Sequence, residues 1–406
     1  MVSMIKKYDD AINLLTSVGK FHISLGLDRM EQILELLGNP QEKLNCIHVA
    51  GTNGKGSVCA ILSSVLVAAG KKVGLYTSPH LFKYTERIQI CGEKIPDETF
   101  AQYVFEISEL ADSHGIDLTE FEILTTVMFK YFADNDVEIV VLETGLGGRF
   151  DATNVIKRNL CSIITHVDFD HTERLGNTID KIAYEKAGII KPNCPCIVFE
   201  GKEVYYDVAN EIGAALIVIS PFENTENLAL KGVHQQENLS LALAAIKTVF
   251  PEISQDVIDK GLKNVKHPGR FQYIKEKNLI IDGAHNPNGI EALKQSLDMY
   301  FPNQKRRFIF GCLRNKEYGQ MLQILFAPSS HHFPASGEGN NDEVYFYHFK
   351  HANSCEVSEL RAVCPVESKE LTADTEIDFS DGHLNIICGS LYMISELADK
   401  FNLSVL

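Results

Sequence analysis

The sequence predicts an α/β protein with two domains, each a mainly parallel sheet flanked by helices. Short runs of apolar, often β-branched residues alternate along the chain with segments of helical periodicity, which indicates right-handed crossovers between parallel strands. A glycine-rich loop lies between a strand pattern and a helix pattern at residues 51–57. The alternation begins again after a polar stretch at 221–227, so we expect domains at 1–224 and 225–406.

Composition describes a globular protein with enough apolar residues for more than one core. The 406 residues are 45% hydrophobic and carry a net charge of −16, which argues against non-specific binding to nucleic acid or to an anionic membrane. The N-terminus lacks the apolar core of a signal peptide, and no apolar run approaches the roughly 18 residues of a membrane span.

Most of the ten cysteines are scattered through apolar contexts, as expected for reduced, buried thiols in a cytoplasmic protein. The one close pair, Cys194 and Cys196, has no second pair or histidine cluster beside it, so it is not read as a metal site. No heptad pattern or apolar edge demands association, and we expect a monomer.

The first 44 residues read as helical, with a turn at Ser24–Arg29 and a helix from Asp28 that ends at Gly38. The next strand reaches Val49 and enters the loop G-T-N-G-K-G-S, and a helix follows as far as Gly70. This order suits a phosphate chain, because glycines let backbone N–H groups point inward and the helix start adds positive potential. The loop departs from the general phosphate-loop pattern, since Val49 stands where that pattern has a glycine and Gly56 separates Lys55 from Ser57.

The rest of the first domain continues the alternation. Strands are expected at 72–80, 137–145, 161–167, 196–200 and 215–219, with two helices within 97–135 joined near Gly115 and another at 178–188. In the second domain we expect helices at 234–250 and 254–264 and strands at 279–281, 308–310, 344–349 and 384–388. Residues 327–342 read as a flexible loop, in which His331 and His332 are taken as solvated.

Polar side chains follow several strands of the first domain. Ligands bind at the carboxyl ends of parallel strands, and Ser78, Glu143 and His171 fall at three such ends beside the glycine loop. A hydroxyl, a carboxylate and an imidazole can hold a hard cation whose other ligands are water and phosphate oxygens. We therefore predict a magnesium site formed by these residues.

Lys186 comes shortly after His171 and is expected in the middle of the helix at 178–188. Its next neighbours are small or apolar, which favours a partly buried amine with a lowered pKa and greater nucleophilicity. The second domain adds three polar clusters: His234 with Asn238, H-P-G-R at 267–270, and D-G-A-H-N-P at 282–287. Arginine and aspartate there could bind a nucleotide.

Taken together, the motifs resemble those of the folylpolyglutamate synthase/dihydrofolate synthase family, within the Mur ligase superfamily. In order, the chain shows G-T-N-G-K-G-S, T-S-P-H, E-R-I, L-E-T-G-L-G-G-R-F-D-A-T-N, D-H, E-K-A-G-I-I-K, H-Q-x-x-N, H-P-G-R, D-G-A-H-N-P and G-S-L-Y. The likeness spans roughly residues 20–320 and the end of the chain, whereas 327–380 show no family pattern. It implies a P-loop ATP-binding first domain and a Rossmann-like glutamate ligase second domain.

The resemblance also implies roles for individual residues. ATP contacts would be Gly54, Lys55, Gly56, Ser57, Asn238, Arg270, Asp282 and His285, the last four from the second domain; magnesium ligands would be Ser78, Glu143 and His171. Catalysis would rest on Lys55, Lys186 and His171, with Lys186 carbamylated to supply a ligand near a second magnesium ion. Substrate contacts would be Gly26, Leu27, Asp28, Arg29, Arg87, Thr119, Glu120, Phe121, Glu122, Phe150, Asp151 and Ala152.

The implied reaction is ATP-dependent addition of L-glutamate to dihydropteroate, to tetrahydrofolyl-polyglutamate, or to both. A carboxylate is a poor electrophile, so phosphoryl transfer from ATP would first give an acyl phosphate, which the amine of glutamate then attacks. The protein would mainly position the reactants and exclude water, as a cleft between two domains could. Two other interpretations remain: a ligase of amino acids to a cell-wall nucleotide precursor, and a non-catalytic ATP-binding module.

Overall fold

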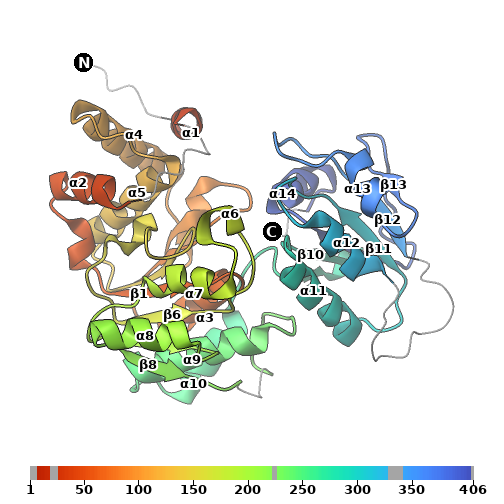
Figure 1. Cartoon of the computed structure of the whole chain (residues 1–406). Helices are drawn as coiled ribbons and strands as arrows, with labels where there is room; N and C mark the ends of the chain where they lie inside the picture. Colours follow the sequence, from red (N-terminus) through yellow and green to blue (C-terminus); the bar gives the residue numbers. More distant parts are fainter. Residues whose placement is uncertain (1–6, 19–25, 222–225, 328–341, 404–406) are drawn as a thin grey trace. The chain divides into compact units, whose positions relative to one another are not determined.

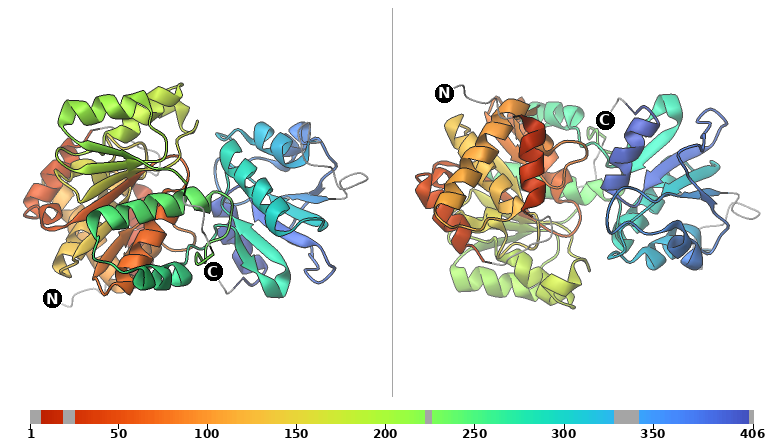
Figure 2. Two further views of the ribbon diagram at one scale, coloured as in Figure 1. Left: turned by 90° about the horizontal axis from the view of Figure 1, so that it is seen from below. Right: turned by 90° about the horizontal axis from the view of Figure 1, so that it is seen from above.

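The computed structural model describes residues 7–18, 26–221, 226–327 and 342–403. The chain divides into two compact units. Unit 1 comprises residues 1–229 and 236–266, and unit 2 comprises residues 230–235 and 267–406. In each unit the sheet lies between helices, as Figures 1 and 2 show.

Unit 1 is built around an eight-stranded sheet of order β4-β3-β2-β5-β1-β6-β7-β8. Its strands are β1 (Cys46–Ala50), β2 (Val73–Tyr76), β3 (Ile88–Ile90), β4 (Glu93–Lys94), β5 (Ile139–Glu143), β6 (Cys161–Ile164), β7 (Pro195–Val198) and β8 (Ala215–Val218). Its helices are α1 (Tyr8–Ser17), α2 (Asp28–Leu36), α3 (Lys55–Ala68), α4 (Asp97–Ser113), α5 (Glu120–Asp134), α6 (Thr172–Leu175), α7 (Ile179–Ala187), α8 (Glu203–Ile212), α9 (Gln235–Val249) and α10 (Gln255–Asn264). All strand pairs are parallel except β2–β3 and β3–β4, a hairpin edge that the sequence patterns did not predict.

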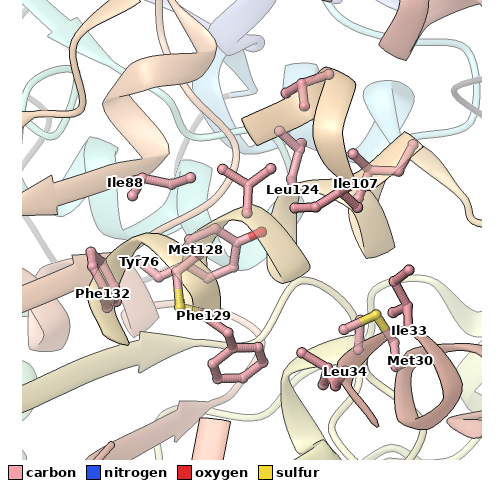
Figure 3. Packing of buried hydrophobic residues seen from close by; sticks show 14 of the residues in the cluster. Met30, Ile33, Leu34, Tyr76, Ile88, Ile107, Leu124, Met128, Phe129 and Phe132 are labelled. Atoms are coloured by element: carbon pink, nitrogen blue, oxygen red, sulfur yellow. The ribbon is translucent and has the colours of Figure 1, made fainter. Parts of the chain in front are cut away.

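The two faces of this sheet are covered by different helices. On one face α1, α2, α4 and α5 bury side chains of β2 and β5 in a large apolar cluster, part of which is shown in Figure 3. Phe129 and Phe132 of α5 are fully buried there. α7 and α8 cover the β6–β7 end in a second cluster. α3 packs on β1, β2 and β5, with α10 against it.

The boundary expected at 224/225 differs from the division in the structure. α9 and α10 belong to unit 1 because α10 packs directly on α3: Ser64 Oγ donates to the Gly261 carbonyl at 2.8 Å, and a Cβ at Gly261 would lie 2.5 Å from the Cα of Val65. This close approach requires glycine. Part of the stretch taken as a linker, residues 222–225, lies outside the described residues.

Unit 2 contains a six-stranded sheet of order β13-β12-β11-β14-β10-β9. Its strands are β9 (Gln272–Ile274), β10 (Leu279–Asp282), β11 (Arg306–Phe310), β12 (Glu343–Phe346), β13 (Lys369–Glu370) and β14 (Leu384–Cys388), and its α-helices are α11 (Pro287–Tyr300), α12 (Tyr318–Phe326), α13 (Val357–Val363) and α14 (Leu391–Lys400). Among these described strands, only the β9–β10 pair is antiparallel. The predicted α/β class with two mainly parallel sheets is confirmed.

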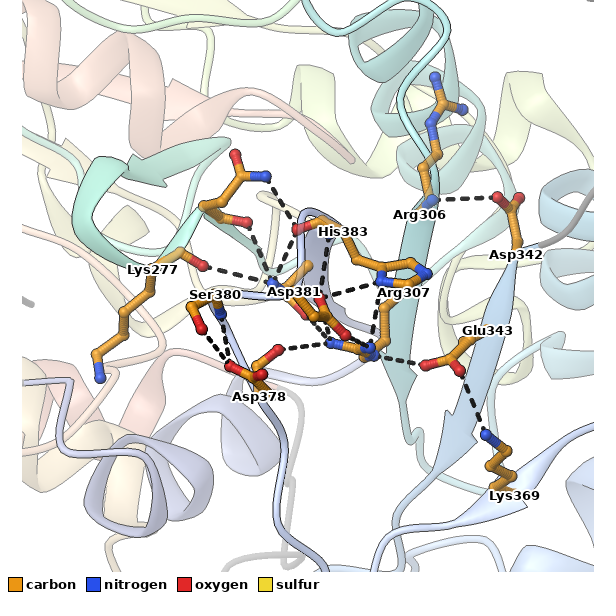
Figure 4. A network of polar contacts seen from close by, with 12 residues as sticks. Lys277, Arg306, Arg307, Asp342, Glu343, Lys369, Asp378, Ser380, Asp381 and His383 are labelled. Atoms are coloured by element: carbon orange, nitrogen blue, oxygen red, sulfur yellow. Dashed lines mark hydrogen bonds and ion pairs between the residues drawn. The ribbon is translucent and has the colours of Figure 1, made fainter.

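A polar network joins strands at the amino end of the unit 2 sheet (Figure 4). Arg307, buried at the start of β11, donates from Nε to Glu343 Oε2 at 2.7 Å and from Nη1 to Asn385 Oδ1 at 3.0 Å, and it also pairs with Asp381. Its guanidinium thereby fixes the 378–383 segment. The loop expected at 327–342, with His331 and His332, lies outside the described residues except at 327 and 342.

Candidate active site

The glycine loop connects β1 to α3 in a backbone conformation that only glycine adopts readily. Gly51 has a φ of 153° and Gly54 a φ of 91°, where α3 begins. A Cβ at Gly51 would lie 1.8 Å from Thr165 Oγ1, and one at Gly54 would lie 2.2 Å from Asn238 Oδ1. At both positions the backbone conformation is unfavourable for any residue other than glycine, and there is no space for a side chain.

Residues after β6 hold this loop in place. The N–H of Thr52 donates to the carbonyl of His166 at 2.8 Å, and Thr165 Oγ1 donates to the carbonyl of Asn53 at 2.7 Å. Thr52 Oγ1 also donates to the carbonyl of Asp168 at 3.0 Å. The start of the 165–171 segment, which leads to His171, is thus fixed relative to the glycine loop. This loop, residues 51–57, is called the phosphate loop.

Two lysines converge on one carbonyl of the loop. Lys55 Nζ donates to Gly51 O at 3.1 Å and to Thr52 O at 3.2 Å, and Lys186 Nζ donates to Gly51 O at 2.8 Å. Gly56 and Ser57 lie in the first turn of α3, where the Ser57 side chain is buried. A phosphate chain bound over the loop would offer Lys55 stronger acceptors than these carbonyls.

Lys186 is buried, as its neighbours predicted, but it lies in the last turn of α7 rather than at mid-helix. Burial lowers its pKa from 10.5 to about 7, and the nearby charge of Lys55 acts in the same direction. Asp170 and Asp151 oppose the shift. The lowered pKa favours the neutral, nucleophilic form of the Lys186 amine over the ammonium form.

The three predicted magnesium ligands fall at carboxyl ends of strands close together in the sheet. Ser78 follows β2, Glu143 ends β5, and His171 immediately precedes α6 after β6, with β1 lying between β5 and β6. The carboxylate of Glu143 is buried and accepts from the N–H of Ser78 at 3.1 Å. His171 has Asp170 and Glu173 each 3.8 Å from one of its ring nitrogens.

This donor set fits a magnesium ion that is already bound to phosphate. Among the residues described by the structure, no three His, Cys, Asp or Glu side chains gather closely enough to hold a metal. One carboxylate, one hydroxyl and one imidazole leave most of an octahedral shell to water and phosphate oxygens, as Mg²⁺ prefers. The residues present are therefore compatible with a nucleotide-bound cation.

Several predicted substrate residues contact one another. Arg29 forms a two-pronged ion pair with the buried Glu122, with Nη2–Oε1 at 2.7 Å and Nε–Oε2 at 3.2 Å. Glu122 also accepts from the N–H of Thr119 at 2.8 Å and so caps α5. Gly26, Leu27 and Asp28 lead into α2, which begins at Asp28. The pair joins the start of α2 to the start of α5.

A second group surrounds Tyr84. The Tyr84 hydroxyl donates to Glu120 at 2.9 Å, while Arg87 donates to His80 Nδ1 at 2.9 Å and lies over the Tyr84 ring. Phe121 packs so closely on Gly145 that a Cβ there would lie 2.6 Å from its ring. These side chains connect the segment after β2 with the start of α5.

Phe150, Asp151 and Ala152 lie in the loop after β5, which we call the acceptor loop (residues 145–154). Phe150 is 46% exposed, whereas Asp151 and Ala152 are buried. Asp151 accepts from the N–H of Leu146 at 2.8 Å and of Thr153 at 3.0 Å, so its carboxylate closes the loop on itself. Burial raises the pKa of Asp151 against the effect of these bonds.

Asn238 was expected to reach the nucleotide from the second domain, and this part of the prediction is wrong. It belongs to unit 1 and lies buried against Gly54, because α9 is part of that unit. Its amide is thus in contact with the phosphate loop itself.

The other three residues predicted to contact the nucleotide, Arg270, Asp282 and His285, lie in unit 2. Asp282 accepts from the N–H of Phe271 at 2.7 Å and of Ala284 at 2.8 Å, while His285 Nδ1 lies 2.8 Å from the carbonyl of Gly283. A Cβ at Gly283 would lie 2.4 Å from Arg270 Nη1, so this glycine leaves room for the arginine. Asp282 therefore shapes the turn that carries Arg270.

Sequence reasoning did not single out His48, which is fully buried in β1. Its Nε2 lies 2.8 Å from Thr153 Oγ1 of the acceptor loop. The available signal was a lone histidine in an apolar strand immediately before the glycine loop.

Known proteins match both halves of this chain. The family profile described as "Mur ligase middle domain" matches residues 49–242, and "Mur ligase, glutamate ligase domain" matches residues 269–365. The dihydrofolate synthase/folylpolyglutamate synthase of Bacillus subtilis is 32% identical over 98% of this chain and 100% of its own length. The Escherichia coli protein of the same name is 36% identical over 75% of each chain.

Solved structures agree over nearly the whole chain. E. coli FolC in complex with DHPP and ADP has a TM-score of 0.83 at 30% identity and covers 98% of both chains. A Yersinia pestis folylpolyglutamate synthase/dihydrofolate synthase with AMPPNP and Mn ion has a TM-score of 0.85 at 29% identity, again over 98% of both chains. Nucleotide and divalent metal are thus bound by proteins of this fold. The chain belongs to the dihydrofolate synthase/folylpolyglutamate synthase family of the Mur ligase superfamily, whose members are ligases that form carbon–nitrogen bonds.

Proposed function

We propose that this protein uses ATP to join L-glutamate to a folate-type acceptor, either dihydropteroate or tetrahydrofolyl-polyglutamate, with release of ADP and phosphate. The observation that carries the proposal is the convergence of Lys55 and Lys186 on the phosphate loop, beside Glu143 at the end of a neighbouring strand. Family membership agrees with this chemistry.

The first step would transfer the γ-phosphoryl group of ATP to the acceptor carboxylate. The carboxylate oxygen attacks phosphorus, the bond to the β,γ-bridging oxygen breaks, and an acyl phosphate and ADP result. Lys55 would leave the carbonyls of Gly51 and Thr52 for the phosphates and neutralise charge that develops during transfer. Gly54, Gly56 and Ser57 would contribute loop and helix N–H groups.

In the second step the amine of glutamate would attack the acyl carbon, and phosphate would leave with the former carboxylate oxygen. No residue needs to form a covalent intermediate, so the protein acts by positioning and by excluding water. Asn238 supports the phosphate loop from within unit 1. Arg270, Asp282 and His285 of unit 2 stay predicted nucleotide contacts, with Asp282 acting through the turn that it braces.

Magnesium would screen the charge of the transferring phosphoryl group. Ser78, Glu143 and His171 are the residues proposed to hold one such ion. We further propose that Lys186 is carbamylated: its neutral amine adds to CO2, one proton is released, and the new carboxylate supplies a ligand for a second ion. Its lowered pKa supplies the neutral amine, and the neighbouring charge of Lys55 favours the anionic product.

The acceptor would bind at the edge of unit 1 formed by the α2 and α5 starts and the acceptor loop. Arg29, Glu122 and Thr119 form a rigid base, while the exposed Phe150 offers an aromatic surface for a pterin ring. The other proposed contacts with the acceptor are Arg87, Glu120, Phe121, Asp151, Ala152 and the turn at Gly26–Asp28.

We expect the enzyme to work as a monomer on small-molecule substrates and without nucleic acid, in keeping with its charge of −16. We expect the protein to work in the cytoplasm, where its ten cysteines would stay reduced. Within the described ranges no helix is long and apolar enough to cross a membrane.

The proposal is tested by measuring ADP release with ATP, magnesium and glutamate, using dihydropteroate and tetrahydrofolate as separate acceptors. Release should require both glutamate and one of these acceptors, and Lys55→Ala should abolish it. Activity on a cell-wall nucleotide precursor instead would favour the other ligase class. ATP binding without glutamate-dependent ADP release would indicate a non-catalytic module, and glutamate-dependent release that persisted in Lys55→Ala would contradict the role of that lysine.

A further inference from the structure

His48 occupies a position that neither phosphate binding nor metal binding explains. It lies in β1, opposite Leu142 of β5 and Ser162 of β6, and its side chain is fully buried. The side chains of β1 alternate between the two faces of the sheet. The Nε2 atom of His48 lies 2.8 Å from Thr153 Oγ1. A buried polar side chain in the central strand is costly unless it makes a specific contact.

The direction of the hydrogen bonds follows from the atoms present. Thr153 Oγ1 donates its single proton to Asp151 Oδ1. It must therefore accept from His48, so Nε2 carries the proton and the other ring nitrogen, Nδ1, is an acceptor. Nδ1 is buried and has no hydrogen-bond partner among the described residues, which fits a neutral ring.

From Asp151 the contacts continue through the acceptor loop. The same carboxylate accepts from the N–H of Leu146 at 2.8 Å, which closes residues 146–151 into a turn. Asn154 Nδ2 donates to the carbonyls of Arg149 and Gly188, each at 3.0 Å, and Lys191 Nζ donates to the carbonyl of Asn154 at 3.2 Å. Phe150 is exposed in a loop that these hydrogen bonds of Asp151 and Asn154 hold on both sides.

We propose that His48 is a positioning residue for acceptor binding: through Thr153 and Asp151 it connects the central strand to the acceptor loop and fixes the place of Phe150. The inference rests on the proposed role of that loop in holding the folate-type acceptor. Because β1 also leads into the phosphate loop, one strand would then set the position of both reactants relative to each other.

The test compares variants that remove the hydrogen bond with variants that keep it. His48→Leu and Thr153→Val remove the donor or the hydroxyl at similar volume, whereas His48→Gln and Thr153→Ser can retain the contact. Ser162→Ala is the matched control, because it removes a buried hydroxyl at the same register in the next strand, where Ser162 Oγ donates to Ile189 O at 2.8 Å.

We expect His48→Leu and Thr153→Val each to raise the KM for the acceptor by roughly tenfold, the order expected for one lost buried hydrogen bond, with the KM for ATP within about twofold of wild type. The double variant should be no worse than the poorer single one. Thr153→Ser and His48→Gln should restore most of the affinity. Equal increases in both KM values, or wild-type behaviour of Thr153→Val, would overturn the proposal.

Backbone hydrogen exchange separates this inference from the proposed function. Amides 146–153 should exchange faster in Thr153→Val than in Ser162→Ala, whatever the loop binds. Unchanged exchange would overturn the positioning role. Faster exchange in Thr153→Val together with an unchanged acceptor KM in Phe150→Ala would keep the anchoring of the loop and refute its assignment to the acceptor.

Discussion

Lys186 Nζ donates a hydrogen bond to the carbonyl of Gly51 at 2.8 Å, and thereby joins the end of α7 to the start of the phosphate loop. Lys55 Nζ donates to the same carbonyl, so two amines that would repel each other when charged share one acceptor. Removing the proton of Lys186 relieves this repulsion, and so would converting its amine to a carbamate.

A first prediction concerns pH and stability. Lys186 has a pKa of about 7 in the folded protein against 10.5 ordinarily, so between these values the unfolded chain binds more protons. The cost of burying the charged amine is therefore fully present below pH 7 and disappears as pH rises towards 10.5. Lys186→Met should be more stable than wild type at pH 6, and the difference should shrink by pH 10. Urea unfolding in CO2-free buffer measures this, and a difference independent of pH would contradict it.

The same residue predicts a dependence of activity on CO2. Wild-type turnover should fall in degassed buffer and recover with bicarbonate, because the carbamate is in equilibrium with CO2. Lys186→Ala should lose at least about a hundredfold in kcat and show no response to bicarbonate. Lys181→Ala, on the exposed part of the same helix, serves as the control. Full activity of the wild type without CO2 would exclude the modification.

The glycine loop predicts a sharp difference among Gly→Ala variants. Gly51→Ala and Gly54→Ala should abolish ATP binding, because both residues have positive φ and the new Cβ would collide with Thr165 or Asn238. Gly319→Ala in α12 meets nothing within 4 Å and should stabilise the protein by roughly 0.5–1 kcal/mol. Titration with a nucleotide analogue and thermal unfolding together check this, and normal ATP affinity in Gly51→Ala would count against the loop assignment.

The Arg307 network predicts that the stability of the fold decreases in acid. Hydrogen bonding to Arg307 lowers the pKa of Asp381 and of Glu343, so their contribution to stability is present above the unfolded values near 4 and is lost as pH falls through the folded values. Arg307→Met should cost about 1–3 kcal/mol at pH 7 and flatten the loss of stability below pH 4. Arg314→Met, which breaks an exposed pair, should cost under about 1 kcal/mol. A larger effect for Arg314 would contradict this ranking.

Much of the fold could be predicted because the buried strands are short apolar runs between helical patterns. β5 and β14, for example, lie within the expected ranges. The β3–β4 hairpin, β9 and β13 were not predicted, since segments of two or three residues leave no periodicity to detect. The assignment of α9 and α10 to unit 1 could not be predicted either, because a helical pattern does not show which core the apolar face packs against.

The candidate site, like the fold, could be predicted only in part from the sequence. Motifs placed the glycine loop, Ser78, Glu143 and His171 at one edge of the sheet, because strand ends can be located in sequence. What Arg29, Glu122 and Asp151 contact could not be read from spacing: each makes hydrogen bonds across a loop or between helices. The contact of His48 with Thr153 spans 105 positions and depends on the register of β1 with its neighbours.

The central claim, phosphoryl transfer to the acceptor carboxylate, is tested most directly with an acceptor whose carboxylate carries ¹⁸O. After one turnover with ATP and glutamate, one labelled oxygen per turnover should appear in the inorganic phosphate, because the acyl phosphate breaks between carbon and that oxygen. Unlabelled phosphate, with the whole of the label in the amide product and in water, would contradict an acyl phosphate.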